Sequence, residues 1–268
     1  MSFEWLNAYL EHLDDLRKRI IVIAASIGAI FFFCIVFELK SVVVSGIPLA
    51  YPYPNPFNPV AIQLFTKMRA DLVPAAINGQ PIITVVLTPL DAIMVEIKVA
   101  LFIAVAIGMP IIVHQIGKFI APALKPKEKS LLIKIALPSA MLFIAGAVFA
   151  YMFVVPFVFS FLYRIAGSMV DQTFLSPGEF IDFTLTFLIG FGLAFELPVF
   201  MVGLCALGLV QPDFWKKNWR YSTVAIFVFG AVITPDGSGV TMFLVAIPML
   251  VLYLAGYLIS RYKYGVES

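Results

Sequence analysis

The sequence has 268 residues, of which 62% are apolar and 13% are charged, whereas soluble domains carry roughly 25% charged residues. Together with a mean hydropathy of +1.00, this composition excludes a soluble enzyme, a disordered chain and a nucleic-acid-binding protein. It indicates a protein that crosses the membrane several times.

Long apolar stretches predict six membrane-spanning helices, because a helix needs about 20 apolar residues to cross about 30 Å of hydrocarbon. The last stretch carries one charge, Asp236, within a Pro/Gly-rich turn signal, and therefore divides into two helices. In chain order we expect an amphipathic N-terminal segment (1–19), span one (20–37), an external loop (38–91), span two (92–118), a cytoplasmic loop (119–130), span three (131–163), an external loop (164–180), span four (181–209), a cytoplasmic loop (210–220), span five (221–234), an external turn (235–239), span six (240–260) and a tail (261–268). The fold class is thus an all-α integral membrane protein.

Basic residues set the orientation, because they accumulate on the cytoplasmic side of membrane proteins. Thirteen of the 18 Lys and Arg residues gather on one side of the predicted topology: Arg17, Lys18, Arg19, Lys118, Lys125, Lys127, Lys129, Lys134, Lys216, Lys217, Arg220, Arg261 and Lys263. We therefore expect both termini to be cytoplasmic and the protein to lie in the cytoplasmic membrane.

The external loop over 38–91 begins with a proline-rich stretch that includes Pro48, Pro52 and Pro54. Closely spaced prolines favour an extended, stiff chain. An amphipathic helix over 60–73 and an extended stretch over 82–87 follow. We expect this loop to form a cap over the outer end of the bundle.

Acidic residues near the first span have two interpretations. Glu11 and Asp15 are four residues apart, so on a helix they share a face and repel each other unless a cation lies between them. The segment is either a solvated helix at the membrane surface or a docking site for a cationic ligand. Glu128 is likewise either part of a charge-balanced turn among lysines or a carboxylate that holds a guanidinium.

Glu196 lies near the middle of the fourth predicted span, where an ionised carboxylate is costly unless it is paired, hydrated or protonated. It is either a functional group or a protonated side chain that bonds a carbonyl freed by Pro198. Its candidate partners are Lys98, His114 and Gln115. Asp236 is either functional or simply a turn former.

The sequence carries no hydrolase, metalloprotease or phosphate-binding signature, and its two histidines are too far apart in the predicted topology to share a metal. Both cysteines, Cys34 and Cys205, lie inside apolar stretches. We therefore expect no enzymatic activity, no cofactor and no metal.

Five motifs occur in order along the predicted topology. They are 12–20 (HLDDLRKRI), 119–124 (FIAPAL) with Glu128, 149–156 (FAYMFVVP), 194–198 (AFELP), and 234–236 (TPD) with 246–248 (AIP). On this topology they resemble the TatC family, the multi-span core of twin-arginine protein translocases. The resemblance implies a curved, glove-like bundle that binds twin-arginine signal peptides and organises export of folded proteins, driven by the protonmotive force.

The resemblance also implies site residues and partners. The residues implied in signal-peptide binding are Asp15, Glu128, Phe119, Glu11, Asp14, Arg17 and Lys18. At the position of Asp15 the family usually has Glu. Glu196 matches the family's intramembrane carboxylate, and Thr234, Asp236 and Thr241 lie where partner subunits pack. The implied partners are signal peptides of folded cargo, single-helix TatA/TatB-type subunits, membrane lipid and further copies in a larger complex, with no nucleic acid.

The fifth predicted helix, 221–233, is shorter than the hydrocarbon is thick. We expect this side of the bundle to thin the bilayer or to recruit partner helices. The alternative function is a proton-coupled carrier of small solutes that uses Glu196. An intramembrane hydrolase is disfavoured because no nucleophile and base pair is apparent.

Overall fold

The computed structural model describes residues 4–44, 47–74, 76–77, 80–86, 88–120, 126–169, 174–234 and 239–265. Five of its helical segments are long and apolar enough to cross a membrane: His12–Val36, Pro89–Phe119, Leu137–Gly167, Pro177–Ala206 and Gly239–Tyr264. A sixth apolar helix, Trp219–Ile233, is too short to count among them. The predicted all-α membrane fold is confirmed, including the short fifth helix.

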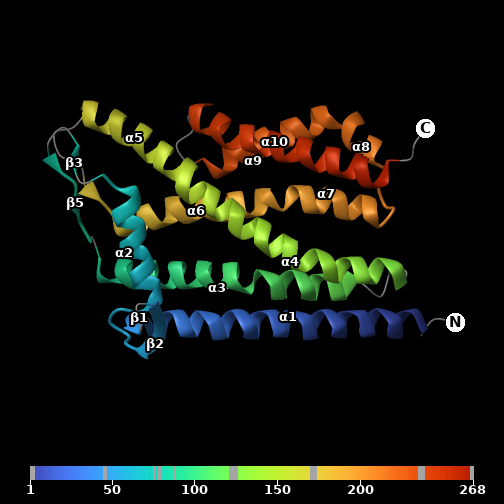
Figure 1. The fold of residues 1–268 in the computed structure, drawn as a ribbon, viewed down its shortest axis with the longest axis horizontal. Helices are drawn as coiled ribbons and strands as arrows, with labels where there is room; N and C mark the ends of the chain where they lie inside the picture. Colours follow the sequence, from blue (N-terminus) through green and yellow to red (C-terminus); the bar gives the residue numbers. More distant parts are fainter. Residues whose placement is uncertain are drawn as a thin grey trace.

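The long helices lie side by side in an array that follows the chain (Figure 1). Helix α1 (Glu4–Val36) packs on α3 (Pro89–Ile120), and α3 packs on α4 (Pro126–Phe149). Next come α6 (Pro177–Phe195) and α7 (Leu197–Ala206), then the short α8 (Pro212–Lys217), α9 (Trp219–Ile233) and α10 (Gly239–Tyr264). Both termini lie at one end of the array, which we call the terminal end; the opposite end is the loop end.

Two helices are interrupted where the sequence places proline. A π-helical turn, Ala150–Val154, joins α4 to α5 (Val155–Met169) just before Pro156. Pro198 lacks an N–H, and α6 ends at Phe195 while α7 begins at Leu197. By contrast, Pro110, Pro138 and Pro248 lie inside helices that continue past them.

The loop end carries the strands and a crossing helix (Figure 1). β1 (Phe37–Val44) pairs antiparallel with β2 (Ile47–Pro54), from Phe37 opposite Pro54 to Val44 opposite Ile47. Helix α2 (Val60–Leu72) follows, and then three two-residue strands, β3 (Ala76–Ile77), β4 (Gln80–Pro81) and β5 (Ile83–Thr84), of which β5 pairs in parallel with β6 (Phe174–Leu175). The prolines predicted an extended chain, but its pairing into a hairpin was not predicted.

The buried core extends through the bundle, from Met68 of α2 to Val245 of α10, and includes the crossing of α4 and α6. Phe143, Phe187 and Phe191 are almost fully buried there. Gly146 permits the close approach, since a Cβ at this position would lie 2.9 Å from the carbonyl carbon of Phe191. In contrast, only 6% of the α1 span window is buried, so this helix presents most of its surface outward.

Candidate functional site

At the terminal end, α1 meets the last turn of α3. The rings of His12 and Phe119 stack with centroids 4.5 Å apart and planes inclined by 24°. This contact holds the N-terminal part of α1 against the last turn of α3. It brings the predicted residue Phe119 next to the acidic segment of α1.

Asp15 lies one turn beyond His12 and is paired within its own helix. The Nε of Arg19 donates to Asp15 Oδ2 at 2.8 Å, and the Asp15 side chain remains 35% exposed. Asp14, Arg17 and Lys18 are exposed beside it. The i,i+4 spacing is a local signal that identifies Arg19 as the partner of Asp15, although Arg19 entered the prediction only as one of the basic residues that orient the chain.

Glu128 is the third residue of α4, which begins at the terminal end shortly after α3 ends there (Figure 1). The backbone of Glu11 lies in α1, one turn before Asp15. The side chains of Glu11 and Glu128 lie outside the part of the chain that the structure describes. The structure thus brings Asp15 and Phe119 to one end of the bundle and starts the helix of Glu128 at the same end.

Glu196 occupies the break between α6 and α7. Its backbone N–H donates to Leu193 O at 3.1 Å, and its carbonyl accepts from Phe200 N at 2.9 Å. The buried hydroxyl of Ser139 in α4 donates to Glu196 Oε2, whereas Oε1 is buried without a hydrogen-bond partner among the described residues. One carboxylate oxygen is therefore bound and the other keeps its capacity to accept a proton or a donor.

The predicted partners of Glu196 were wrong. Lys98 instead donates from Nζ to both oxygens of Asp182 in α6, at 2.6 and 2.8 Å. Ser139 and Asp182 were both missed, since neither is close in sequence to the group it pairs with. Long-range pairing of this kind leaves no local signal in a single sequence.

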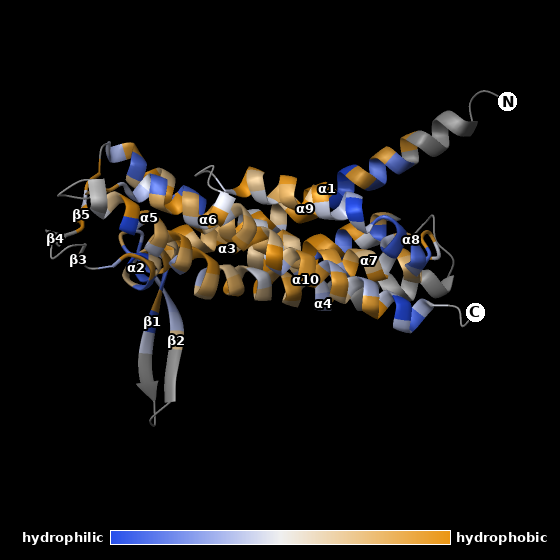
Figure 2. Cartoon of the chain, turned by 90° about the horizontal axis from the view of Figure 1, so that it is seen from above, coloured by the Kyte–Doolittle hydropathy of each residue, from blue (hydrophilic) through white to orange (hydrophobic). Residues whose placement is uncertain are grey.

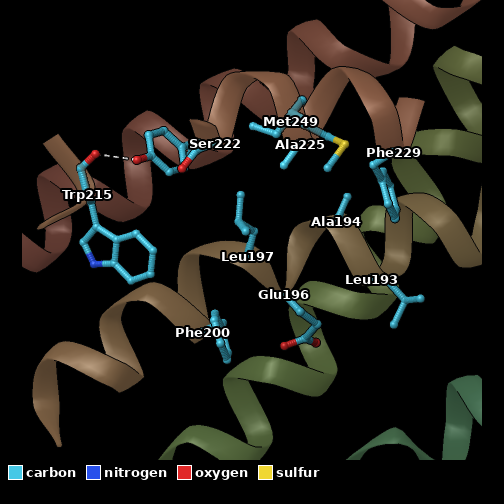
Figure 3. Close-up of a pocket in the computed structure, with 12 residues that line it drawn as sticks. Leu193, Ala194, Glu196, Leu197, Phe200, Trp215, Ser222, Ala225, Phe229 and Met249 are labelled. Atoms are coloured by element: carbon cyan, nitrogen blue, oxygen red, sulfur yellow. Dashed lines mark hydrogen bonds between the residues drawn. The ribbon is translucent and has the colours of Figure 1, made fainter. Parts of the chain in front are cut away.

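Glu196 also lines a pocket of about 430 Å³ between α7, α9 and α10 (Figure 3). The walls are mainly apolar, with Phe200, Phe229 and Met249 among them. The carboxylate points away from Ala225 and Met249 on the opposite wall, toward α4. At one side, Tyr253 donates to Trp215 O at 2.6 Å and ties α10 to α8.

Two of the three residues expected to contact partner subunits, Thr234 and Thr241, lie at the loop end of α9 and α10. Thr234 is 4% exposed and donates to Gly230 O at 2.9 Å, and Thr241 is fully buried in the first turn of α10. Asp236 lies outside the described residues. Both threonines are thus buried within this chain.

Comparison with known proteins places these features in a family. The sequence model of the family described as "Sec-independent protein translocase protein (TatC)" matches residues 11–248. Curated proteins of that name are similar along almost the whole chain: the one from Cenarchaeum symbiosum is 38% identical, covering 96% of each chain, and the one from Aquifex aeolicus is 33% identical, covering 96% of this chain and 98% of the relative.

A solved structure has the same architecture. A crystal structure described as the twin arginine translocase receptor TatC superposes with a TM-score of 0.70 at 28% sequence identity, covering 94% of this chain and 98% of that one. The predicted resemblance is therefore confirmed over the sequence and the fold. The chain belongs to the TatC family of Sec-independent protein translocase proteins.

Proposed function

We propose that this chain is the receptor subunit of a twin-arginine translocase. It binds twin-arginine signal peptides at the terminal end and organises export of folded proteins across the membrane, using the protonmotive force. The observation that carries the proposal is a carboxylate, Asp15, that already holds a guanidinium, that of Arg19, at this end of the bundle. The family comparisons support this function and not the solute-carrier alternative.

Two acids form the proposed arginine site. Asp15 is in α1 and Glu128 is in the first turn of α4. In the proposed site, each of these two carboxylates would bind one of the two adjacent arginines. A guanidinium offers a planar fork of donors to a carboxylate, whereas a lysine ammonium acts as a point charge. Phe119 supplies an aromatic face beside the site, Glu11 and Asp14 add negative charge, and Arg17 and Lys18 keep the segment at the membrane surface.

We assign Glu196 to a second contact, deeper in the bundle. The pocket beside it is apolar and could receive the hydrophobic part of a signal peptide or a partner helix. The carboxylate of Glu196 lies behind this wall, where its buried Oε1 has no hydrogen-bond partner among the described residues.

The short helix α9 is the proposed contact for single-helix subunits. One face of it is exposed and apolar: Tyr221, Val224, Val228 and Val232 are 77%, 63%, 58% and 78% exposed. A helix of 15 residues spans about 22 Å, less than the hydrocarbon thickness of about 30 Å. A partner helix packed here would meet this face, and Thr234, Asp236 and Thr241 are the residues proposed to complete the contact.

Peptide binding to the reconstituted protein tests the receptor function. We expect a signal peptide with Arg-Arg to bind more tightly than its Lys-Lys version. Asp15→Asn and Glu128→Gln should each weaken Arg-Arg binding by roughly tenfold, the worth of one hydrogen bond between charged groups. Asp213→Asn is the matched control, because Asp213 is an exposed acid in α8 outside the proposed site.

The proposal fails if both peptides bind equally, or if the two site variants bind like wild type. Transport of a small solute that Glu196→Gln abolishes would instead favour the carrier function.

A further inference from the structure

A groove of about 920 Å³ lies between α3, α6 and α9. Its apolar lining includes Leu101 and Met109 of α3, Leu185 and Ile189 of α6, and Phe229 of α9. Leu101 and Ile189 are 48% and 40% exposed, so the groove is open at the surface of the bundle.

The polar side chains of the groove lie together at its loop end. Among the described residues that line it, the polar ones are Lys98, Asp182 and Thr186. Both α3 and α6 begin at the loop end (Figure 1), and Lys98 and Asp182 are the first lining residues of these two helices. The α3 and α6 walls are therefore polar at the loop end and apolar farther into the bundle.

The polar end lies near the boundary between lipid headgroups and hydrocarbon. Figure 2 shows hydrophobic residues over the middle of the bundle and hydrophilic residues at its two ends. Asp182 is the sixth residue of the 30-residue span Pro177–Ala206, and Lys98 is the tenth of the 31-residue span Pro89–Phe119. Since about 20 residues cross the hydrocarbon, Asp182 lies at its edge and the backbone of Lys98 lies about one turn deeper. The Lys98 ammonium meets Asp182, so both charges lie at headgroup level.

The ion pair at this end keeps unused hydrogen-bonding capacity. Lys98 Nζ donates to both carboxylate oxygens of Asp182, at 2.6 and 2.8 Å. An ammonium has three N–H donors and a carboxylate has about four acceptor positions, so a donor and further acceptor positions remain. The side chains of Lys98 and Asp182 are 39% and 58% exposed, so a ligand can reach both. The pair thus presents a positive donor and a negative acceptor side by side.

A zwitterionic phospholipid matches this arrangement in charge and in length. Its phosphate accepts from Lys98, and a primary ammonium donates to Asp182. The α6 lining from Asp182 to Leu193 is about 16 Å long, close to the roughly 15 Å of hydrocarbon that one leaflet fills. An anionic headgroup lacks the ammonium and would be repelled by Asp182, and a quaternary ammonium has no N–H to donate.

We propose that the groove binds one zwitterionic phospholipid of the leaflet at the loop end. The phosphate lies on Lys98, the primary ammonium of the headgroup lies on Asp182, and an acyl chain lies along the apolar walls. The lipid site adjoins the Glu196 pocket, because Leu193 and Phe229 line both, but its charged end is at the loop end of the groove.

Native mass spectrometry of the full chain tests the lipid site. The chain would be released from detergent micelles that hold equal amounts of phosphatidylethanolamine and phosphatidylglycerol, at a temperature at which each variant remains folded. We expect one phosphatidylethanolamine to be retained, several-fold more often than phosphatidylglycerol. Asp182→Asn should abolish or reverse this preference, because Lys98 would then bind either phosphate without a neighbouring anion. Glu179→Gln is the matched control, since Glu179 is an exposed acid in the first turn of α6 outside the groove lining.

A second pair of variants tests whether the acyl chain lies in the groove. Leu101→Trp enlarges an exposed lining residue and leaves the ion pair in place. Its retention of phosphatidylethanolamine should be several-fold lower than that of Ile107→Trp, because Ile107 is exposed on the same helix but lies outside the groove lining.

Equal retention of the two lipids by the wild type, or retention of neither, would overturn the proposal. A preference that persists in Asp182→Asn would also overturn it, since the ion pair would then not recognise the headgroup. Equal retention of phosphatidylethanolamine by Leu101→Trp and Ile107→Trp would show that the lipid lies elsewhere on the bundle.

Discussion

The Asp15 carboxylate is engaged before any ligand arrives, because Arg19 donates to Oδ2 from within the same helix. If Asp15 binds the signal peptide as proposed, an arginine that uses both carboxylate oxygens must displace Arg19 or share the carboxylate with it. The internal pair therefore holds the carboxylate in place and also competes with the ligand. Such a site favours a ligand with two arginines. Each ligand guanidinium offers a planar fork of donors to a carboxylate, whereas Arg19 donates a single hydrogen bond to Asp15.

Arg19→Gln should therefore tighten binding of the Arg-Arg peptide, by up to roughly tenfold if the whole internal hydrogen bond is relieved. Titration of a fluorescent peptide measures the change. Arg220→Gln is the matched control, since it removes the same charge from an exposed position in α9, outside the proposed site. If both variants tighten binding equally, the effect is one of net charge and the competition is absent.

Single residues also show what one sequence can predict about a site. Asp15 and Glu196 stood out because acids are rare in this chain and costly near lipid. Their hydrogen-bond partners were harder to predict. Arg19 lies four residues from Asp15 and follows the i,i+4 spacing of a helix, whereas Ser139 lies 57 residues from Glu196. Contacts of the second kind depend on how helices pack, which hydropathy does not encode.

At the level of elements, the base of the β1–β2 hairpin depends on an ionised Glu38. The hydrogen bond from Asn55 lowers the pKa of Glu38 most, burial opposes it, and Asn58 and Lys40 lower it further. Since the pKa is lower in the folded chain, the stabilisation is complete above the ordinary pKa of glutamate, about 4.3. It is lost as the pH falls through the folded pKa.

We expect amide hydrogen exchange in β1 and β2 to accelerate below about pH 4, beyond the intrinsic change in exchange rate. In Glu38→Gln, exchange should already be faster at neutral pH and should show no acid step. An acid step that persists in Glu38→Gln would assign it to another group.

The Lys98–Asp182 pair links α3 to α6 beside an apolar groove of about 920 Å³. Both side chains are partly exposed, so the pair itself is worth on the order of 1 kcal/mol. An unpaired lysine within a span is more costly than an apolar residue. Asp182→Asn should therefore lower the melting temperature in detergent more than the double variant Lys98→Met/Asp182→Asn does. If the changes in stability of the single variants Asp182→Asn and Lys98→Met simply add up to that of the double variant, the pair contributes no coupling free energy.

For the whole molecule, the crossing of α4 and α6 is the contact that can least tolerate added volume. A Cβ on Gly146 would collide with the backbone of Phe191, which cannot move aside as a side chain can. Gly146→Ala should cost about 1–3 kcal/mol of stability, seen as a lower melting temperature. Gly28→Ala is the control because nothing lies within 4 Å of its added Cβ, and it should leave stability unchanged or slightly raised.

The overall fold was predictable from hydropathy because each span must be apolar over its whole length. The predicted short helix over 221–233 corresponds to α9, Trp219–Ile233. The β1–β2 hairpin and the π-helical turn at Ala150–Val154 were not predicted. Pairing and helix register depend on tertiary packing, which composition and periodicity describe only weakly.

The array of helices also bears on how the chain is made. Along the series α1, α3, α4 and α6, each helix after the first packs against the one before it, so a newly synthesised span finds its neighbour already in the bilayer (Figure 1). Helix α9 is different, because its main contacts are with α10, which follows it. During synthesis, α9 therefore leaves the ribosome before its packing partner exists. We infer that α9 and α10 enter the membrane together as a hairpin.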